Sequence, residues 1–96
     1  MDLEKLRSSY SEIKLAIFVD TSILSRIALE QLHRIKTDLQ IEDHQIQIYR
    51  TDKDIEKVME YNVIACPSLF RLDKRPINCL IGSLDNADAV KAFLRM

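Results

Sequence analysis

The chain has 96 residues, of which 47% are hydrophobic and 30% are charged, a composition typical of a folded protein rather than of a disordered or membrane-embedded one. Fourteen basic residues against fifteen acidic ones leave a formal net charge of −1, so no overall field attracts nucleic acid or anionic lipid. A single Gly excludes a glycine-rich phosphate-binding loop.

The length fits one domain over residues 1–96, and we expect it in the cytoplasm. The first residues carry acidic side chains and no long apolar core, so they do not resemble a secretory signal. No apolar run approaches the length of a membrane span. Residues 1–12 place a few apolar side chains at helix-like spacing, which predicts a short helical or flexible arm.

The first half of the chain predicts a strand, a helix and a second strand. The dense apolar run 13–19 indicates a central buried strand. A stretch without Gly or Pro then predicts a helix over 23–38, capped by one of the polar residues 20–22. Its expected inward residues are Ile23, Ile27, Leu32, Ile35 and Leu39, and its expected solvated residues are Arg26, Glu30, Arg34 and Lys36.

The segment 45–50 alternates polar and apolar residues strictly, which predicts a strand with one covered and one exposed face. Because a helical crossover joins it to the strand 13–19, the two strands should be parallel. A shorter helix should start at Thr51 or Asp52. In it we expect Ile55, Val58 and Met59 to face inward.

The second half of the chain is organised around Pro67. Apolar runs enter and leave this proline, so we expect a cis peptide after Cys66 and a strand that opens at Pro67. The polar segment 73–76 predicts a hairpin loop, and Gly82 should close the returning strand. A last helix should be capped by Asp85 or Asn86 and bury Ala87, Val90, Phe93 and Leu94.

The full order is βαβαββα, an α/β fold with a four-stranded mixed sheet and helices on both faces. The part from Pro67 onwards resembles the C-terminal half of the thioredoxin fold. An ordinary αββα segment is the alternative.

The two cysteines are expected to be free thiols. If the hairpin turns at 73–76, Cys79 lies opposite Phe70, and Cys66 lies about 13 Å further along its strand. A disulfide needs Cα atoms within about 7 Å.

No catalytic, cofactor-binding or metal-binding residue is predicted. A reactive thiol would be expected at the start of the first helix, but the sequence there reads Asp20-Thr21-Ser22-Ile23. Cys66 is either a thiol that contacts a ligand or, as we favour, a small buried side chain. The two histidines, His33 and His44, lack a second ligand at metal-site spacing.

Partner binding is better supported than catalysis. The strand 45–50 presents Gln45, Gln47 and Tyr49 on one side, and an edge strand with uncharged polar side chains is available for docking. The alternative, weighed equally, is that these side chains are only solvated. The same edge could also pair copies of the chain into a homo-oligomer.

Four stretches together resemble one thioredoxin-like family. They are Phe18-Val19-Asp20-Thr21, the alternating strand 46–48, and Val63 to Leu69 with Ile81-Gly82-Ser83-Leu84. They are similar to the KaiB family of circadian clock proteins, including the KaiB-like sensory domain of the clock kinase SasA. The similarity covers about residues 14–94.

The resemblance implies a non-enzymatic module without cofactor. Such a module docks on the ATPase ring of KaiC through the strand equivalent to 45–50, or acts in a clock-type kinase pathway. It also implies the ability of some members to refold their C-terminal half. We expect the thioredoxin-like arrangement here, because only Pro76 stands where many members have several prolines. Two positions depart from the family pattern: Cys66 replaces a Thr, and Gln47 replaces a basic residue. A thiol or redox protein that uses Cys66 is the alternative.

Overall fold

A computed structural model describes residues 14–73 and 77–95 of the chain. Four strands, β1 (Leu15–Val19), β2 (Ile46–Arg50), β3 (Ser68–Arg71) and β4 (Asn78–Ile81), form one sheet in the order β2-β1-β3-β4. β1 is parallel to β2 and antiparallel to β3, and β3 is antiparallel to β4. The mixed sheet and the central place of the first strand are confirmed.

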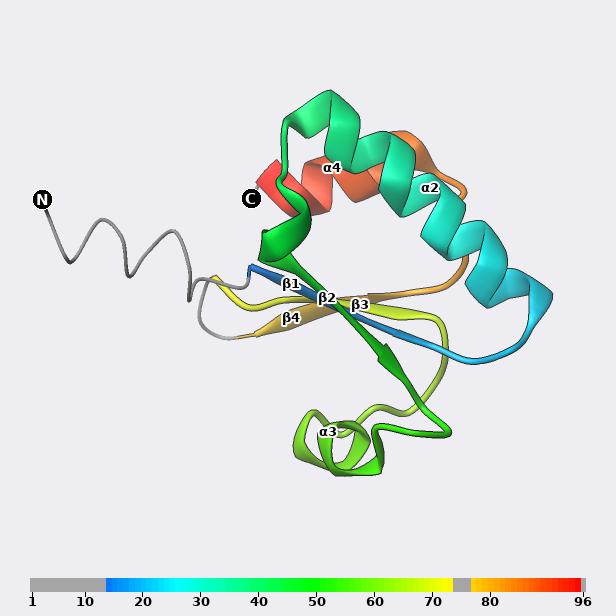
Figure 1. Cartoon of the computed structure of the whole chain (residues 1–96). Coiled ribbons are helices and arrows are strands. Elements are labelled where there is room, and N and C mark those ends of the chain that lie inside the picture. Colours follow the sequence, from blue (N-terminus) through cyan, green and yellow to red (C-terminus); the bar gives the residue numbers. More distant parts are fainter. Residues whose placement is uncertain (1–13, 74–76, 96) are drawn as a thin grey trace, which may run out of the picture.

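Three α-helices cover the sheet: α2 (Ile23–Leu39), α3 (Ile55–Glu60) and α4 (Ala87–Arg95). Figure 1 shows α2 and α4 on one face of the sheet and α3 on the other. A short 3-10 helix, η1 (Asp43–Gln45), joins α2 to β2. The order βαβαββα with helices on both faces is therefore confirmed. In the described part of the chain, no helix is both long and apolar enough to cross a membrane.

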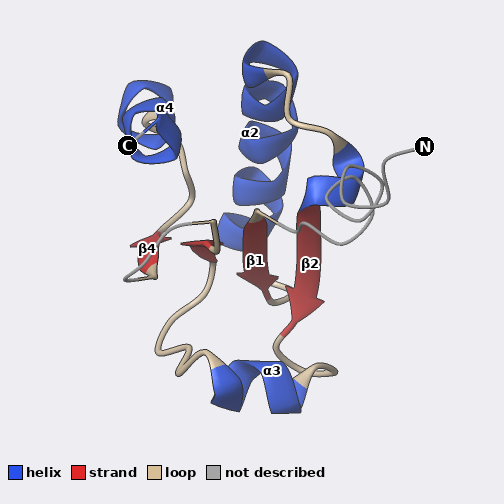
Figure 2. Ribbon diagram, turned by 90° about the vertical axis from the view of Figure 1, so that its left-hand side faces the viewer, coloured by secondary structure: helices blue, strands red, loops and turns tan. Residues whose placement is uncertain are grey.

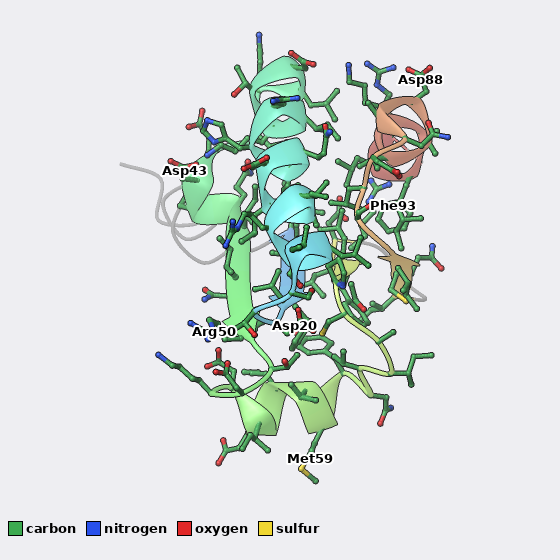
Figure 3. The ribbon with its side chains drawn as sticks, turned by 90° about the vertical axis from the view of Figure 1, so that its right-hand side faces the viewer. Asp20, Asp43, Arg50, Met59, Asp88 and Phe93 are labelled. Carbon is green, nitrogen blue, oxygen red and sulfur yellow. The ribbon has the colours of Figure 1, made fainter. Side chains whose placement is uncertain are left out.

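The main core lies between the sheet and the pair α2 and α4. All five residues of β1 are buried, because β1 is central and helices cover both of its faces. The buried residues of this core are Leu15, Ile17, Val19, Ala28, Leu32, Ile35, Leu69, Leu84, Val90 and Phe93. Figure 3 shows Phe93 between α4 and the sheet. Asn86 Oδ1 accepts a hydrogen bond of 3.1 Å from the Ala89 amide and so caps α4, one of the two predicted capping residues.

A smaller aromatic core lies on the α3 side of the sheet. The ring of Phe18 lies 5.0 Å from that of Tyr49, 5.6 Å from that of Tyr61 and 5.5 Å from that of Phe70, measured between centroids. Phe18 is completely buried. Edge-to-face and offset aromatic pairs add stability beyond the burial of their area. This cluster packs β1, β2 and β3 against the end of α3.

The inward face predicted for the second helix is largely wrong. Ile55 is 59% exposed and Met59 is 72% exposed, and only Val58 packs against the aromatic core. Figure 3 shows Met59 pointing away from the sheet. The helix begins at Ile55 rather than at 51 or 52, so its six residues make less than two turns.

The first helix is confirmed, but Ile23 and Leu24 in its first turn face solvent. Ser22 is its N-cap, and the Ser22 side chain accepts from the Ser25 amide at 3.2 Å. Ile23, predicted to face inward, is exposed, and Ser25 is buried in its place. Hydrogen bonds at the end of β1 hold Ser25 there, and periodicity alone does not reveal them.

The turn around Pro67 leads into β3 and is hydrogen-bonded to the residue that follows β4. The peptide bond between Cys66 and Pro67 is cis, and Gly82 N–H donates to Pro67 O at 2.9 Å. Gly82 has a φ of 125°, a backbone conformation that residues with a Cβ rarely adopt. Both cysteines are free, and Cys79 pairs in register with Phe70, as predicted.

Arg71, the last residue of β3, connects the sheet to α4. Arg71 is buried, with its Nε 2.8 Å from Asp73 Oδ1 and its Nη1 2.9 Å from the carbonyl oxygen of Phe93. The guanidinium group of Arg71 therefore links β3 to α4 within the fold. The rest of the hairpin loop, residues 74–76, and the predicted arm, residues 1–12, lie outside the described residues.

Candidate docking site

The strand β2 forms one edge of the sheet, and in the described part of the chain no strand pairs with its outer side (Figure 2). β2 is in continuous parallel register with β1, and Thr51 N–H donates to Val19 O at 3.0 Å. Because backbone direction alternates along a strand, the amides and carbonyls of Ile46, Ile48 and Arg50 point away from β1.

Both ends of this edge are closed by the chain itself. The Ile46 amide donates to Asp43 O, and the Arg50 amide donates to Asp54 Oδ2 at 2.7 Å. The Arg50 carbonyl also accepts from the Asp54 amide at 2.7 Å. What remains accessible is a short window centred on Ile48. A partner strand can therefore pair only along the middle of β2.

An apolar groove lies beside this window, between α2 and β2. It has a volume of about 310 Å³ and is lined by Leu29, Leu32, His33, Lys36, Asp43, Ile46 and Ile48. Ile48 is 51% exposed although the alternation of the strand predicted it to be covered, because α2 does not extend over the edge of the sheet. The groove and the window are contiguous through Ile46 and Ile48.

A charged pair forms the rim of the groove. Lys36 Nζ and Asp43 Oδ1 form an ion pair between α2 and η1, and the Lys36 side chain is only 19% exposed. Lys36 is therefore not the solvated residue predicted. The hydrogen bond from Lys36 is the main cause that lowers the pKa of Asp43. The rim is thus charged at neutral pH while the floor is apolar.

The three predicted partner-binding residues lie in three different environments in the structure. Gln45 ends η1 and does not belong to β2. Gln47 lies on the strand, and its side-chain amide donates to Ile48 O at 3.4 Å, a long contact across the window. Tyr49 packs in the aromatic core, and burial raises the pKa of its hydroxyl. Sequence reasoning predicted docking at this edge strand, and it did not identify Ile48 or the groove on the opposite face of the strand.

The other end of the sheet holds the corner where thiol chemistry was considered. Ser25 Oγ donates to Asp20 Oδ1 at 2.7 Å and accepts from the Asp20 amide at 3.0 Å. Hydrogen bonds from Ser22 and Ser25 hold the pKa of Asp20 at about 2. Figure 3 shows Asp20 and Arg50 at this end of the sheet. Oxygen atoms and a fixed negative charge, rather than thiols, therefore occupy the start of α2.

The environment of Cys66 opposes thiolate formation. Burial raises the pKa of the Cys66 thiol, and the charge of Asp20 raises it further, although a hydrogen bond with Thr51 acts in the opposite direction. Since the thiolate is the nucleophile in disulfide exchange, this site favours an unreactive thiol.

This leads to a prediction for a Cys79→Ser variant, in which Cys66 is the single thiol. Alkylation of Cys66 by iodoacetamide is expected to be slow at about pH 7 and to rise as the pH passes the ordinary thiol pKa. The rate is measured by mass spectrometry across pH, with the Cys66→Ser variant reporting the exposed Cys79 as control. A fast rate that is already constant near neutral pH would indicate a reactive thiolate and contradict this prediction.

Among residues 14–73 and 77–95, no three His, Cys, Asp or Glu side chains are grouped as metal ligands would be. The β2 edge combines backbone groups able to pair, an apolar pocket beside them and a charged rim.

Comparison with known structures supports the fold. The chain is similar to the N-terminal domain of Synechococcus elongatus SasA, with 18% identity, a TM-score of 0.60, and 82% of this chain and 76% of that chain covered. It is also similar to mitochondrial thioredoxin 3 from Saccharomyces cerevisiae, with 15% identity, a TM-score of 0.68, and 97% and 88% covered. Thioredoxin from Fasciola hepatica gives 14% identity, a TM-score of 0.62, and 97% and 89% covered. The fold is thioredoxin-like.

None of the curated proteins compared with the chain matches it significantly. The sequence model of the KaiB domain matches residues 16–96, which include every strand and helix of the structure apart from the first residue of β1. The chain therefore belongs to the KaiB family.

Proposed function

We propose that this chain is a non-enzymatic, cytoplasmic protein-binding module that docks on a KaiC-like ATPase and regulates its phosphorylation or signal output. Membership of the KaiB family supports the class of partner. The structural observation that carries the proposal is the open window at Ile48 beside the apolar groove.

The window and the groove suit an extended segment of a partner. A strand laid along β2 pairs with the outward backbone groups at Ile48, while an apolar side chain of the segment fills the groove. The ion pair of Lys36 and Asp43 offers polar contacts at the rim. Because both ends of the edge are already bonded, only a short segment fits, which favours a defined loop over a long strand.

The absence of enzymatic activity in this proposal follows from the chemistry of the corner at α2. Thiol exchange needs a low-pKa thiol, whereas burial and Asp20 raise the pKa of Cys66. At the start of α2, Ser22 serves as the helix cap and Ser25 as a buried hydrogen-bond partner of Asp20.

Binding to a purified KaiC hexamer tests the proposal. The wild-type chain is expected to bind, and Ile48→Glu is expected to weaken binding roughly 30-fold, about 2 kcal/mol, because it places a charge in the apolar contact. Ile55→Glu is the matched control, since Ile55 is similarly exposed but lies on α3. Binding is measured by biolayer interferometry, and circular dichroism verifies that both variants fold.

Failure of the wild type to bind the hexamer would remove the proposal. Equal losses in Ile48→Glu and Ile55→Glu would remove the β2 edge as the site. Tyr49 is not a useful probe, because its ring packs on Phe18 and its removal would disturb the aromatic core.

A further inference from the structure

The strand β4 forms the opposite edge of the sheet from β2. Figure 2 shows β4 and β2 on the two sides, with β1 between them. In the part of the chain that the structure describes, no strand pairs with the outer side of β4. Leu80 pairs with Leu69 and Asn78 with Arg71, and Gly82 N–H donates to Pro67 O.

These bonds fix which backbone groups of β4 are unpaired. Because Gly82 bonds toward β3, Leu80 and Asn78 also face β3, and the amides and carbonyls of Cys79 and Ile81 face outward. Unlike the edge at β2, where Asp43 and Asp54 occupy backbone amides, none of the described hydrogen bonds occupies these outward groups.

The side chains along this edge are apolar and accessible. Cys79 is exposed, Ile81 is 47% exposed, and Ile77, directly before the strand, is also exposed. Cys79 and Ile81 lie on the same face as Phe70, the face of α3, but do not belong to the aromatic core that α3 covers. An uncharged, apolar and unprotected edge strand is a surface on which another strand pairs.

We propose that β4 pairs antiparallel with β4 of a second copy of this chain, so that two sheets join into one. The residues on this edge are self-complementary: Ile77, Cys79 and Ile81 read the same in both directions. A twofold axis through Cys79 therefore pairs Cys79 with Cys79, and Ile77 with Ile81, in one register.

Charge allows this pairing. The sequence from Ile77 to Leu84 contains no charged residue, so no like charges meet across the axis. The register engages every outward backbone group of Cys79 and Ile81 and covers both exposed isoleucines. The β2 edge, on the other side of the sheet, stays open for a different partner.

Light scattering after size exclusion tests the pairing. The wild-type chain is expected to shift from monomer to dimer as concentration rises. Ile81→Lys is expected to weaken the dimer at least tenfold, because a charged side chain would replace the apolar side chain that lies opposite Ile77 of the second copy. Ile64→Lys is the matched control, since Ile64 is 86% exposed but lies in the loop before β3.

Cross-linking locates the axis. Directly opposed residues of a hydrogen-bonded antiparallel pair have Cα atoms about 5.5 Å apart, so a short bis-maleimide should link Cys79 to Cys79. Cys66→Ser is expected to keep the cross-linked dimer and Cys79→Ser to lose it. A monomer at all concentrations, a dimer unaffected by Ile81→Lys, or a cross-link through Cys66 would each overturn the proposal, whatever the result with KaiC.

Discussion

Replacing Phe18 by Ala is expected to destabilise the fold by about 3–5 kcal/mol, the cost of emptying a buried aromatic site. Phe18 is completely buried, and its ring contacts those of Tyr49, Tyr61 and Phe70, with centroid distances of 5.0, 5.6 and 5.5 Å. Its loss would leave β2 and the end of α3 without their shared contact. Since domains of this size are stable by only about 5–15 kcal/mol, much of the total would be lost.

Urea unfolding followed by circular dichroism measures this loss. Ile55→Ala is the control, because Ile55 is exposed on α3 and its substitution should change stability by no more than about 0.5 kcal/mol. A loss below about 1 kcal/mol for Phe18→Ala would contradict the packing described for the aromatic core.

Replacing Arg71 by Met should lower stability by about 2–3 kcal/mol, in the range of hydrogen bonds to charged groups. Arg71 Nη1 donates to Phe93 O at 2.9 Å, near the end of α4, where helix carbonyls lack partners within the helix. Its Nε and Nη2 donate to the carboxylate of Asp73 at 2.8 and 3.3 Å. Met keeps the apolar stem but leaves the Phe93 carbonyl without this donor.

The acid dependence of stability checks the same contact. The hydrogen bond from Arg71 lowers the pKa of Asp73, so its stabilisation is present above the unfolded-state carboxyl pKa and is lost as the pH falls. Asp73→Asn should remove this part of the acid dependence and cost about 1 kcal/mol near neutral pH, a modest figure because Asp73 is partly solvated. Equal stability of wild type and Arg71→Met would show that the contact contributes nothing.

The strong periodic patterns of the sequence predicted most of the fold. The apolar run before Asp20 is β1, and the unbroken helical stretch is α2, which extends only one residue beyond its expected end at 38. The opposition of Cys79 and Phe70 followed from the position of the loop between two short strands. These features depend on local pattern and turn position, which a sequence displays directly.

The errors come from features that depend on tertiary geometry. The apolar periodicity predicted that Ile55, Val58 and Met59 all face inward. The turn closed by Asp54 lets only one side of α3 reach the sheet, so Ile55 and Met59 are exposed. The burial of Arg71 could not be predicted, because its acceptor, the Phe93 carbonyl, lies 22 positions further along the chain. The groove at Ile48 likewise depends on how far α2 extends over β2.

Hydrogen exchange of the chain bound to a KaiC hexamer tests the central claim, that the β2 edge is the docking site. The Ile48 amide points outward from the sheet, so it is expected to exchange readily in the free chain and slowly in the complex. The amides of β4 should change little on binding to the hexamer. Protection confined to β4 or to the corner at Ser22, with Ile48 still exchanging freely in the complex, would contradict the account.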